Sequence, residues 1–396
     1  MIAWAYVSLL MILIAITFLM ATPGPNDDHY LYQKFIESLA AGKIDLTIAG
    51  FHGTDIFGLV AYIFTRSPLS QIYGLMLPAI ALPMLGFLTG RALFRDLFSG
   101  IALATILAMM PFISFVCLRG WTGPGYWFWM LLTIFLAARK SNWTGLPWAF
   151  AILTKPFAIV LLPVILVLYG VTGGILRNQK PETRNLLRSI ITATLLVLAY
   201  FTLEYLQLGR LVIGAHEDLS PGGTIQGPIR ILMNLAHSLQ ILFSVHNYYF
   251  PTPSLTGPGN LMHTSPVLIF LGLFGIFSPR NYWKDLRLPI ALLLGAAGGI
   301  AMNALLDHMD HFYMEASIFL LILAALPVLK KHPLWIPITF ATLHFQWLYF
   351  YLQFRTGFAL GHEFFVMPAV IDLCFAVWIG RLCFTRAAPR PSPTAF

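Results

Sequence analysis

Charge is scarce in this chain, and the scarcity excludes most classes of soluble protein. Only 10% of its 396 residues are Asp, Glu, Lys or Arg, whereas 58% are hydrophobic and 14% are aromatic. A soluble domain carries about 25% charged residues, so this composition excludes a freely soluble globular protein. Apolar stretches of about 20 residues recur from end to end, as a polytopic helical membrane protein requires.

Cysteine is scarce as well. The chain has three, Cys117, Cys374 and Cys383, without a CxxC motif or a metal-type spacing. This pattern argues against a disulfide framework and against a cysteine-based metal site. The net charge of +8 does not predict nucleic-acid binding, because the basic residues cluster in short loops between apolar stretches, which is the positive-inside pattern of membrane proteins.

The apolar stretches predict an all-α polytopic integral membrane protein that forms a single transmembrane domain over residues 1–396. The first stretch lacks a basic n-region and is too long for the h-region of a signal peptide, so we interpret it as a retained helix. With 144–171, treated below, we expect about eleven to thirteen membrane segments. The other predicted segments lie near 2–21, 69–90, 98–118, 124–138, 189–208, 265–279, 288–306, 313–329, 334–353 and 364–381.

The distribution of Lys and Arg predicts the orientation. Sixteen of the 24 fall in short loops and a tail that we assign to the cytoplasm. The opposite face then carries two long loops, 22–68 and 209–264, and the Pro-rich tail 387–396 is expected to be disordered. The sixteen residues are Arg91, Arg95, Arg139, Lys140, Arg177, Lys180, Arg184, Arg188, Arg280, Lys284, Arg287, Lys330, Lys331, Arg381, Arg386 and Arg390.

This orientation constrains how many times residues 144–171 can cross the membrane. The basic loops on either side are both assigned to the cytoplasm, so the chain must cross an even number of times, yet 28 residues are too few for two full spans. Pro156 interrupts the helical hydrogen bonds, and Thr154 or Lys155 can satisfy the freed carbonyls. We favour a re-entrant hairpin with Lys155 at its tip. The alternative is one long kinked helix with 177–188 on the outer face.

The acidic and histidine residues gather on the non-cytoplasmic face. Eleven of the 16 acids and nine of the eleven histidines lie on or near it in this topology. The positive-inside rule does not explain the bias, because acids and neutral histidines contribute little to that rule. We therefore expect the polar chemistry of the protein to face outward.

The first outer loop opens with a pair of acids, Asp27-Asp28. Tyr30, Leu31, Phe35, Ile36, Leu39 and Ala40 then recur at helical spacing, with Gln33, Lys34 and Glu37 opposite, and this pattern predicts an amphipathic helix that ends at Gly42. Acids at a helix start cap backbone N–H groups and interact with the helix dipole. An acid that faces a cavity can instead serve as a general base. We slightly favour Asp28 as the cap and Asp27 as the base.

The order of these features resembles the opening of the GT-C superfamily of membrane glycosyltransferases, which includes protein O-mannosyltransferases and the aminoarabinose transferases of lipid A. The acidic pair, with Tyr30 two residues on, follows a first membrane helix, and an amphipathic helix ends at Gly42. His52-Gly53 lies where many members carry a His- or Pro-rich stretch, and the stretch 149–158, with Lys155-Pro156, is similar to a Lys-Pro segment of bacterial members. The resemblance covers about the first 170 residues, and the remainder in topology alone. Members commonly carry Asp-Glu where this chain has Asp-Asp, so both acids stay candidates.

The resemblance implies an inverting transfer of a sugar from a polyprenyl-phosphate carrier to a lipid, glycan or protein acceptor, at the periplasmic face of a bacterial inner membrane. A first-loop Asp would be the base, and His52, Asp55 and Tyr30 would contact the substrates. Lys155 is the candidate for binding the lipid phosphate. An unpaired lysine at membrane depth costs about 2.5–3.5 kcal/mol, so we expect this lysine to have a functional or paired role. The alternative is that its side chain snorkels to the interface. Arg119 is a second phosphate candidate, or an interfacial anchor beside Trp121.

The run Asp307-His308-Met309-Asp310-His311 has a spacing that a metal ion can use, because His308 and His311 share one helical face. Clustered polar residues between two helices more often form a solvated turn, so we predict no metal site, and a divalent metal cofactor is the less favoured alternative. The resemblance suggests instead that His308 and His311 contact the lipid phosphate or the acceptor.

Two other classes of function stay open from the sequence. A transporter or lipid flippase would show repeated halves and ionisable residues at the midplane of several helices. In this chain only Glu204, Asp372 and His344 qualify as such ionisable residues, and no repeat is visible. A non-catalytic subunit of a membrane complex would not need an acidic pair, a Lys-Pro break and an outward excess of histidine together.

Overall fold

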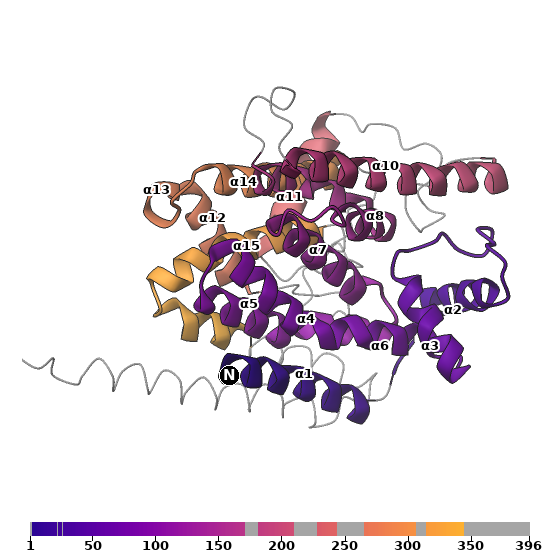
Figure 1. Ribbon diagram of the computed structural model, residues 1–396. Helices are drawn as coiled ribbons and strands as arrows, with labels where there is room; N and C mark the ends of the chain where they lie inside the picture. Colours follow the sequence, from indigo (N-terminus) through magenta and orange to yellow (C-terminus); the bar gives the residue numbers. More distant parts are fainter. Residues whose placement is uncertain are drawn as a thin grey trace, which may run out of the picture.

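The computed structural model describes residues 2–21, 23–25, 27–170, 181–209, 228–243, 265–305 and 314–343, and these ranges contain helices and turns without a strand (Figure 1). Four of the helices are long and apolar enough to cross a membrane: α1 Ile2–Met20, α4 Ser70–Phe94, α10 Pro181–Leu208 and α14 Arg287–Leu305. The predicted all-α membrane protein is therefore confirmed.

Shorter helices complete the bundle, and most of them coincide with predicted segments. They are α5 Leu97–Met109, α6 Pro111–Arg119, α7 Gly123–Ala138, α8 Gly145–Thr154, the 3-10 helix η1 Pro156–Leu161, α9 Leu162–Leu168, α12 Pro266–Phe277, α13 Pro279–Tyr282 and α15 Glu315–Lys331. Residues 335–343 are helical too. The predicted segment 364–381 and the tail 387–396 lie outside the described residues.

The two long loops contain helices of their own. The first holds α2 Asp27–Ala40 and α3 Asp55–Thr65, and the described part of the second is α11 Pro228–Phe243. The end of α2 is as predicted, because Gly42 has a positive φ of 77°, the conformation that ends many helices. The sequence did not predict α3 as a helix.

One predicted segment is two helices in the structure. Residues 98–118 were expected to form a single span, but the chain bends at Met110, between α5 and α6. Pro111 has no backbone N–H and disfavours the helical conformation in the residue before it. Met110 accordingly has extended dihedral angles, φ −73° and ψ 107°. The prediction of one span was wrong because it overlooked this proline.

α4 is the central helix of the bundle. It packs against α5, α7, α3 and α1, and α1 runs alongside it in Figure 1. Small residues permit the close approach: a Cβ on Gly90 would lie 2.5 Å from the Ser99 carbonyl oxygen, as at other tight helix contacts in membranes. On the other side of the bundle, α10 exposes Leu195, Leu198 and Leu206, and these side chains suit contact with lipid.

Residues 144–169 form the predicted hairpin. Thr144, at the start of α8, and Tyr169, at the end of α9, hydrogen-bond through their hydroxyls at 2.7 Å. The indole N–H of Trp148 donates to the Ala158 carbonyl across the turn at 2.9 Å. A continuous helix would separate residues 144 and 169 by about 37 Å, so the kinked-helix alternative is excluded. Lys155, in an extended conformation, lies at the turn.

The hairpin predicts where two positions lie relative to the membrane. Single cysteines at Trp143 and Glu182, in a variant without the three native cysteines, should react with a membrane-impermeant thiol reagent from the same side. A cysteine at Lys43, in the first loop, should react from the other side and serves as the control. Labelling of positions 143 and 182 from opposite sides would contradict the hairpin.

Candidate functional site

The acidic pair is the first turn of α2. Asp27 and Asp28 begin this helix, as predicted, but their side chains lie outside what the structure describes. Phe35 and Ile36 are buried, as predicted, but Tyr30 and Leu31 are exposed and Gln33 is buried. The reason is that Gln33 makes hydrogen bonds to the chain before and within α4, accepting from Gln71 N at 3.1 Å and donating to Ser67 O at 3.2 Å.

His29 fixes the start of α2 to the bundle. Its buried ring hydrogen-bonds through Nδ1 to Gln71 Oε1 at 2.8 Å and through Nε2 to Pro68 O at 3.1 Å. The Gln71 amide in turn donates to Gly120 O at 2.6 Å. Gly120 has a φ of 80°, and a Cβ there would lie 2.7 Å from Gln71 Oε1, so glycine is required. The network holds the acidic pair, the two residues directly before His29, at the C-terminal end of α6.

Arg119 lies at the same place. Its guanidinium donates to Gly24 O at 3.1 Å, and Gly24 N donates to Leu118 O at 3.0 Å. The guanidinium also lies 5.7 Å from the ring centroid of Trp121. The side chain is half-buried. Arg119, the predicted phosphate candidate, and the acidic pair, which contains the predicted base, thus lie on segments that are hydrogen-bonded to each other.

His52 and Asp55 form a buried turn before α3. The His52 N–H donates to Asp55 Oδ2 at 2.7 Å, and the Asp55 N–H donates to His52 O at 2.9 Å, a reciprocal pair like that of a capping box. Asp55 is 1% exposed. Burial raises the pKa of Asp55 to about 8, against the opposing effect of the His52 N–H bond. Tyr32 of α2 packs edge-on against the His52 ring.

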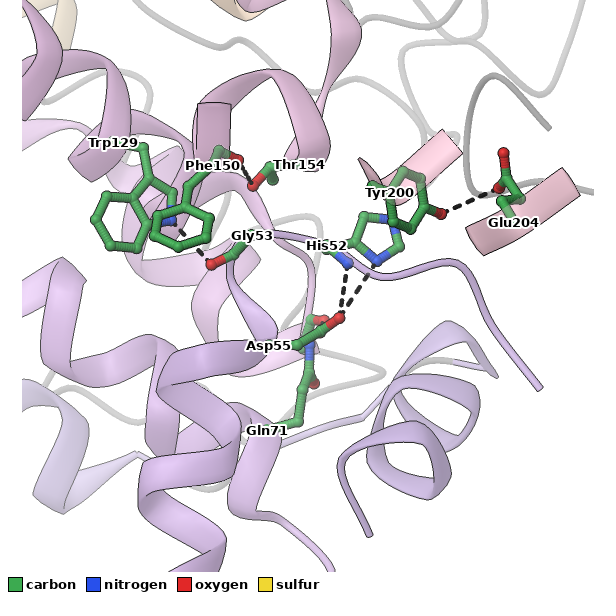
Figure 2. Close-up of polar contacts among 10 residues, drawn as sticks. His52, Gly53, Asp55, Gln71, Trp129, Phe150, Thr154, Tyr200 and Glu204 are labelled. Atoms are coloured by element: carbon green, nitrogen blue, oxygen red, sulfur yellow. Dashed lines mark hydrogen bonds and ion pairs between the residues drawn. The ribbon is translucent and has the colours of Figure 1, made fainter. Parts of the chain in front are cut away.

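The same turn is pressed against α8 of the hairpin. Figure 2 shows Gly53 between His52 and Trp129, whose indole N–H donates to Gly53 O at 3.1 Å. A Cβ on Gly53 would lie 2.3 Å from the carbonyl oxygen of Phe150, which accepts the Thr154 hydroxyl at 2.7 Å. The first loop therefore reaches the hairpin one helical turn before Lys155.

A second buried carboxylate borders this turn from α10. Glu204 is 1% exposed and accepts the Tyr200 hydroxyl at 3.0 Å (Figure 2). Tyr200 packs against Phe51, and a Cβ on Gly50 would lie 3.3 Å from its hydroxyl. Tyr200 therefore connects Glu204 to the chain immediately before His52.

Lys155 forms a buried ion pair. Its Nζ lies 2.7 Å from Glu315 Oε1, with side-chain exposures of 9% and 0%. The indole N–H of Trp127 donates to the other oxygen of Glu315 at 2.9 Å. Lys155 Nζ also lies 5.3 Å from the ring centroid of Tyr126. The lysine is therefore paired within the protein, one of the roles expected for a lysine at membrane depth, and it does not snorkel.

The two polar groups adjoin. Thr54, between His52 and Asp55, packs so closely on α7 that a Cβ on Gly125 would lie 2.3 Å from its methyl group. Tyr126 and Trp127, the partners of Lys155 and Glu315, are the next two residues of α7. The first loop thus packs on α7 directly beside the residues that enclose the ion pair between the hairpin turn and the start of α15.

Several residues of this region escaped the sequence analysis. Glu315, Trp127 and Gln71 were not expected to take part, because no sequence spacing links residues 155 and 315. His308 and His311 lie outside the described residues, and within the described ranges no three His, Cys, Asp or Glu residues cluster as a metal site would require.

The buried ion pair predicts a large effect of a small substitution. Glu315→Gln leaves the Lys155 cation without its counter-charge and should lower the free energy of unfolding by about 3–5 kcal/mol, measured by fluorescence-monitored unfolding in detergent. The double variant Lys155→Met/Glu315→Gln removes both charges and should recover most of this loss. A double variant as unstable as the single one would contradict a charge effect.

The pKa of Asp55 predicts a pH dependence of stability. The folded chain holds the proton of Asp55 up to about pH 8, whereas the usual pKa of this group is 3.8. The contribution of Asp55 to stability is therefore greatest below about pH 4 and declines as the pH rises to about 8. Asp55→Asn should remove this decline, so the variant should gain stability relative to the parent chain as the pH is raised, measured by thermal unfolding from pH 4 to 8.

Asp45 of the same loop provides a control of opposite sign. Hydrogen bonds from the side chain and backbone of Thr47 lower the pKa of Asp45, so its contribution is present above about pH 4 and lost as the pH falls. Asp45→Asn should therefore not gain stability with rising pH. Parallel pH profiles for the two variants would contradict the assignment to Asp55.

No protein-family model and no curated protein matches the chain. Solved structures of the oligosaccharyltransferase of Archaeoglobus fulgidus do match. The form tethered with an acceptor peptide that contains the NVT sequon is 14% identical, with a TM-score of 0.47 over 93% of this chain and 55% of that one. The complex with an inhibitory peptide and a dolichol-phosphate is 14% identical, with a TM-score of 0.46 over 92% and 55%. This chain thus spans about half the length of those proteins, which belong to the GT-C superfamily that its opening resembles.

Proposed function

We propose that the protein is an inverting glycosyltransferase that moves a sugar from a polyprenyl-phosphate donor to an acceptor on the non-cytoplasmic face of a bacterial inner membrane. The observation that carries the proposal is the meeting of the first loop with the hairpin turn. His29 and Arg119 hold the start of α2, while Gly53 touches the hairpin just before Lys155. Acids, histidines and cations from distant parts of the sequence thereby gather at one end of a membrane bundle.

One acid of the Asp27-Asp28 pair acts as the general base in this proposal. The carboxylate takes the proton of the acceptor, the acceptor forms a bond to the anomeric carbon from the side opposite the phosphate, and the bond to the phosphate oxygen breaks. The electron pair of that bond leaves on the polyprenyl phosphate, and the configuration inverts. A general base contributes about 10²–10⁴-fold to such a reaction. The second acid caps α2, where its charge favours the helix dipole.

The departing phosphate needs cationic partners. Arg119 is a good candidate because a guanidinium presents five N–H donors in a fork that suits phosphate, and it is half-buried beside the start of α2. Lys155 has three N–H donors, one of which bonds to Glu315. We propose that Lys155 supports the phosphate from within its ion pair, and that Glu315 keeps the ammonium in place when no substrate is bound.

The remaining residues contact the substrates. His52 and Asp55 shape the wall between the first loop and the hairpin, and Tyr30, exposed on α2, meets the acceptor. His308 and His311, which precede α15 in the sequence, contact the lipid phosphate or the acceptor in this proposal. The donor is a hexosyl or pentosyl lipid phosphate, and the acceptor a lipid, a glycan or a protein.

Substitution of the acidic pair tests the proposed reaction. Asp27→Ala and Asp28→Ala, each assayed with a radiolabelled polyprenyl-phosphate sugar and membrane acceptors, should differ: loss of the base should lower kcat by about 10²–10⁴-fold, whereas loss of the cap should lower stability by about 1 kcal/mol. Glu37→Gln, also on α2, is the control and should keep the parent rate.

Full activity of both acidic variants would contradict the assignment of the base. Uptake of the intact lipid-linked sugar into the opposite leaflet of proteoliposomes, without transfer to any acceptor, would instead identify a flippase, the main alternative.

A further inference from the structure

An apolar cavity lies in the bundle away from the proposed site. It has a volume of about 210 Å³ and is lined by side chains of α5, α15 and the helical residues 335–343. The lining residues are Leu97, Phe98, Ile101, Ala102, Ile106, Leu329, Ile336, Thr339 and Phe340. The cavity runs from Leu97, 51% exposed, to Ile106, 1% exposed, a length of about 14 Å along α5.

The lining contains one polar group without a partner. Thr339 is 1% exposed, and its hydroxyl makes no hydrogen bond within the part of the chain that the structure describes. Its backbone carbonyl accepts the Thr342 hydroxyl. A buried hydroxyl in apolar surroundings costs free energy unless it is hydrogen-bonded. The cavity therefore presents one donor to an occupant that is otherwise apolar.

The mouth of the cavity is basic. Leu97 follows Arg95 and Asp96, and Leu329 precedes Lys330 and Lys331. Asp96 is engaged twice, because it caps the start of α5 through Ser99 N and pairs with Lys330 at 3.0 Å. Arg95 is exposed. Cations therefore exceed carboxylates where the apolar lining reaches the surface, and the loops involved belong to those assigned to the positive-inside face.

We infer that this cavity binds one acyl chain of an anionic glycerophospholipid, with the lipid phosphate at Arg95 and Lys330 and an ester carbonyl accepting the Thr339 hydroxyl. The three chemical parts of such a lipid match the three parts of the site: a basic mouth, one hydroxyl donor and an apolar tunnel. An apolar cavity of about 150 Å³ already holds a benzene molecule, so 210 Å³ accommodates a segment of a hydrocarbon chain.

Other occupants fit less well. A sugar would leave its hydroxyl groups unpaired against an almost wholly apolar lining. A polyprenyl phosphate is also anionic, but its donor function belongs to the opposite face, where the acids and histidines gather. A zwitterionic phospholipid supplies the chain without a net charge for the basic mouth, and each Lys or Arg near an anionic lipid surface favours binding by about five-fold.

Lipid binding to the delipidated full-length protein tests the inference. Phosphatidylglycerol and phosphatidylcholine with identical chains are titrated in detergent, and bound lipid is counted by native mass spectrometry. We expect phosphatidylglycerol to bind at least about five-fold more tightly. Arg95→Asn and Lys330→Gln should each reduce this preference. Asn suits position 95, because the residue there has a φ of 55°.

Two further variants test the interior. Thr339→Val removes a hydroxyl that has no hydrogen-bond partner in the described part of the chain, so it should weaken lipid binding while the melting temperature without lipid is unchanged or higher. Ala102→Trp fills the cavity and should abolish the bound lipid, whereas Ile290→Trp, on an exposed position of α14, should not. Equal binding of the two lipids, unchanged binding in Thr339→Val, or displacement of phosphatidylglycerol by an equimolar polyprenyl phosphate would overturn the inference.

Discussion

The ion pair between Lys155 and Glu315 is the interaction on which the candidate site depends. Pro156 breaks the helix so that the chain turns back inside the bundle, and the turn brings an ammonium group to a depth where an unpaired charge is costly. Glu315 neutralises that charge, and Trp127 and Tyr126 enclose the pair. The pair thereby ties the hairpin, α7 and α15 into one unit, and the hairpin and α7 form the wall against which the first loop packs.

The first loop is held to this unit by backbone contacts as much as by side chains. Gly53 and Gly125 leave no room for a Cβ, and Gly120 combines close contact with a positive φ. The Gly53 contact fixes its distance tightly, because the backbone carbonyl of Phe150 cannot move aside as a long side chain can. Gln71, at the start of α4, links α2 to α6 through both ends of its amide. The loop that carries the acidic pair is consequently part of the rigid bundle.

The sequence predicted the architecture well, because bilayer thickness and the cost of exposed backbone polar groups leave few solutions for apolar segments. The hairpin followed from charge counting together with the length of the segment and the break at Pro156, since positive loops on both sides of a short segment require the chain to return. The break at Met110 was missed because hydropathy does not register a single proline. The amphipathic helix was predicted, but its buried face only in part, because Gln33 is buried by hydrogen bonds to a partner 38 residues away.

The partners of the site residues were beyond the reach of the sequence for a similar reason. Tertiary packing, which no local pattern encodes, brings Glu315 to Lys155 across 160 positions. This separation also has a consequence in time. Ribosomes add about 5–20 residues per second, so Lys155 leaves the ribosome roughly 8–32 seconds before its counter-charge exists. A nascent chain that inserts into the bilayer as it is made must therefore shelter a lone cation during that interval, which makes the hairpin a late-settling element of biogenesis and a natural point of engagement for an insertase or a membrane chaperone.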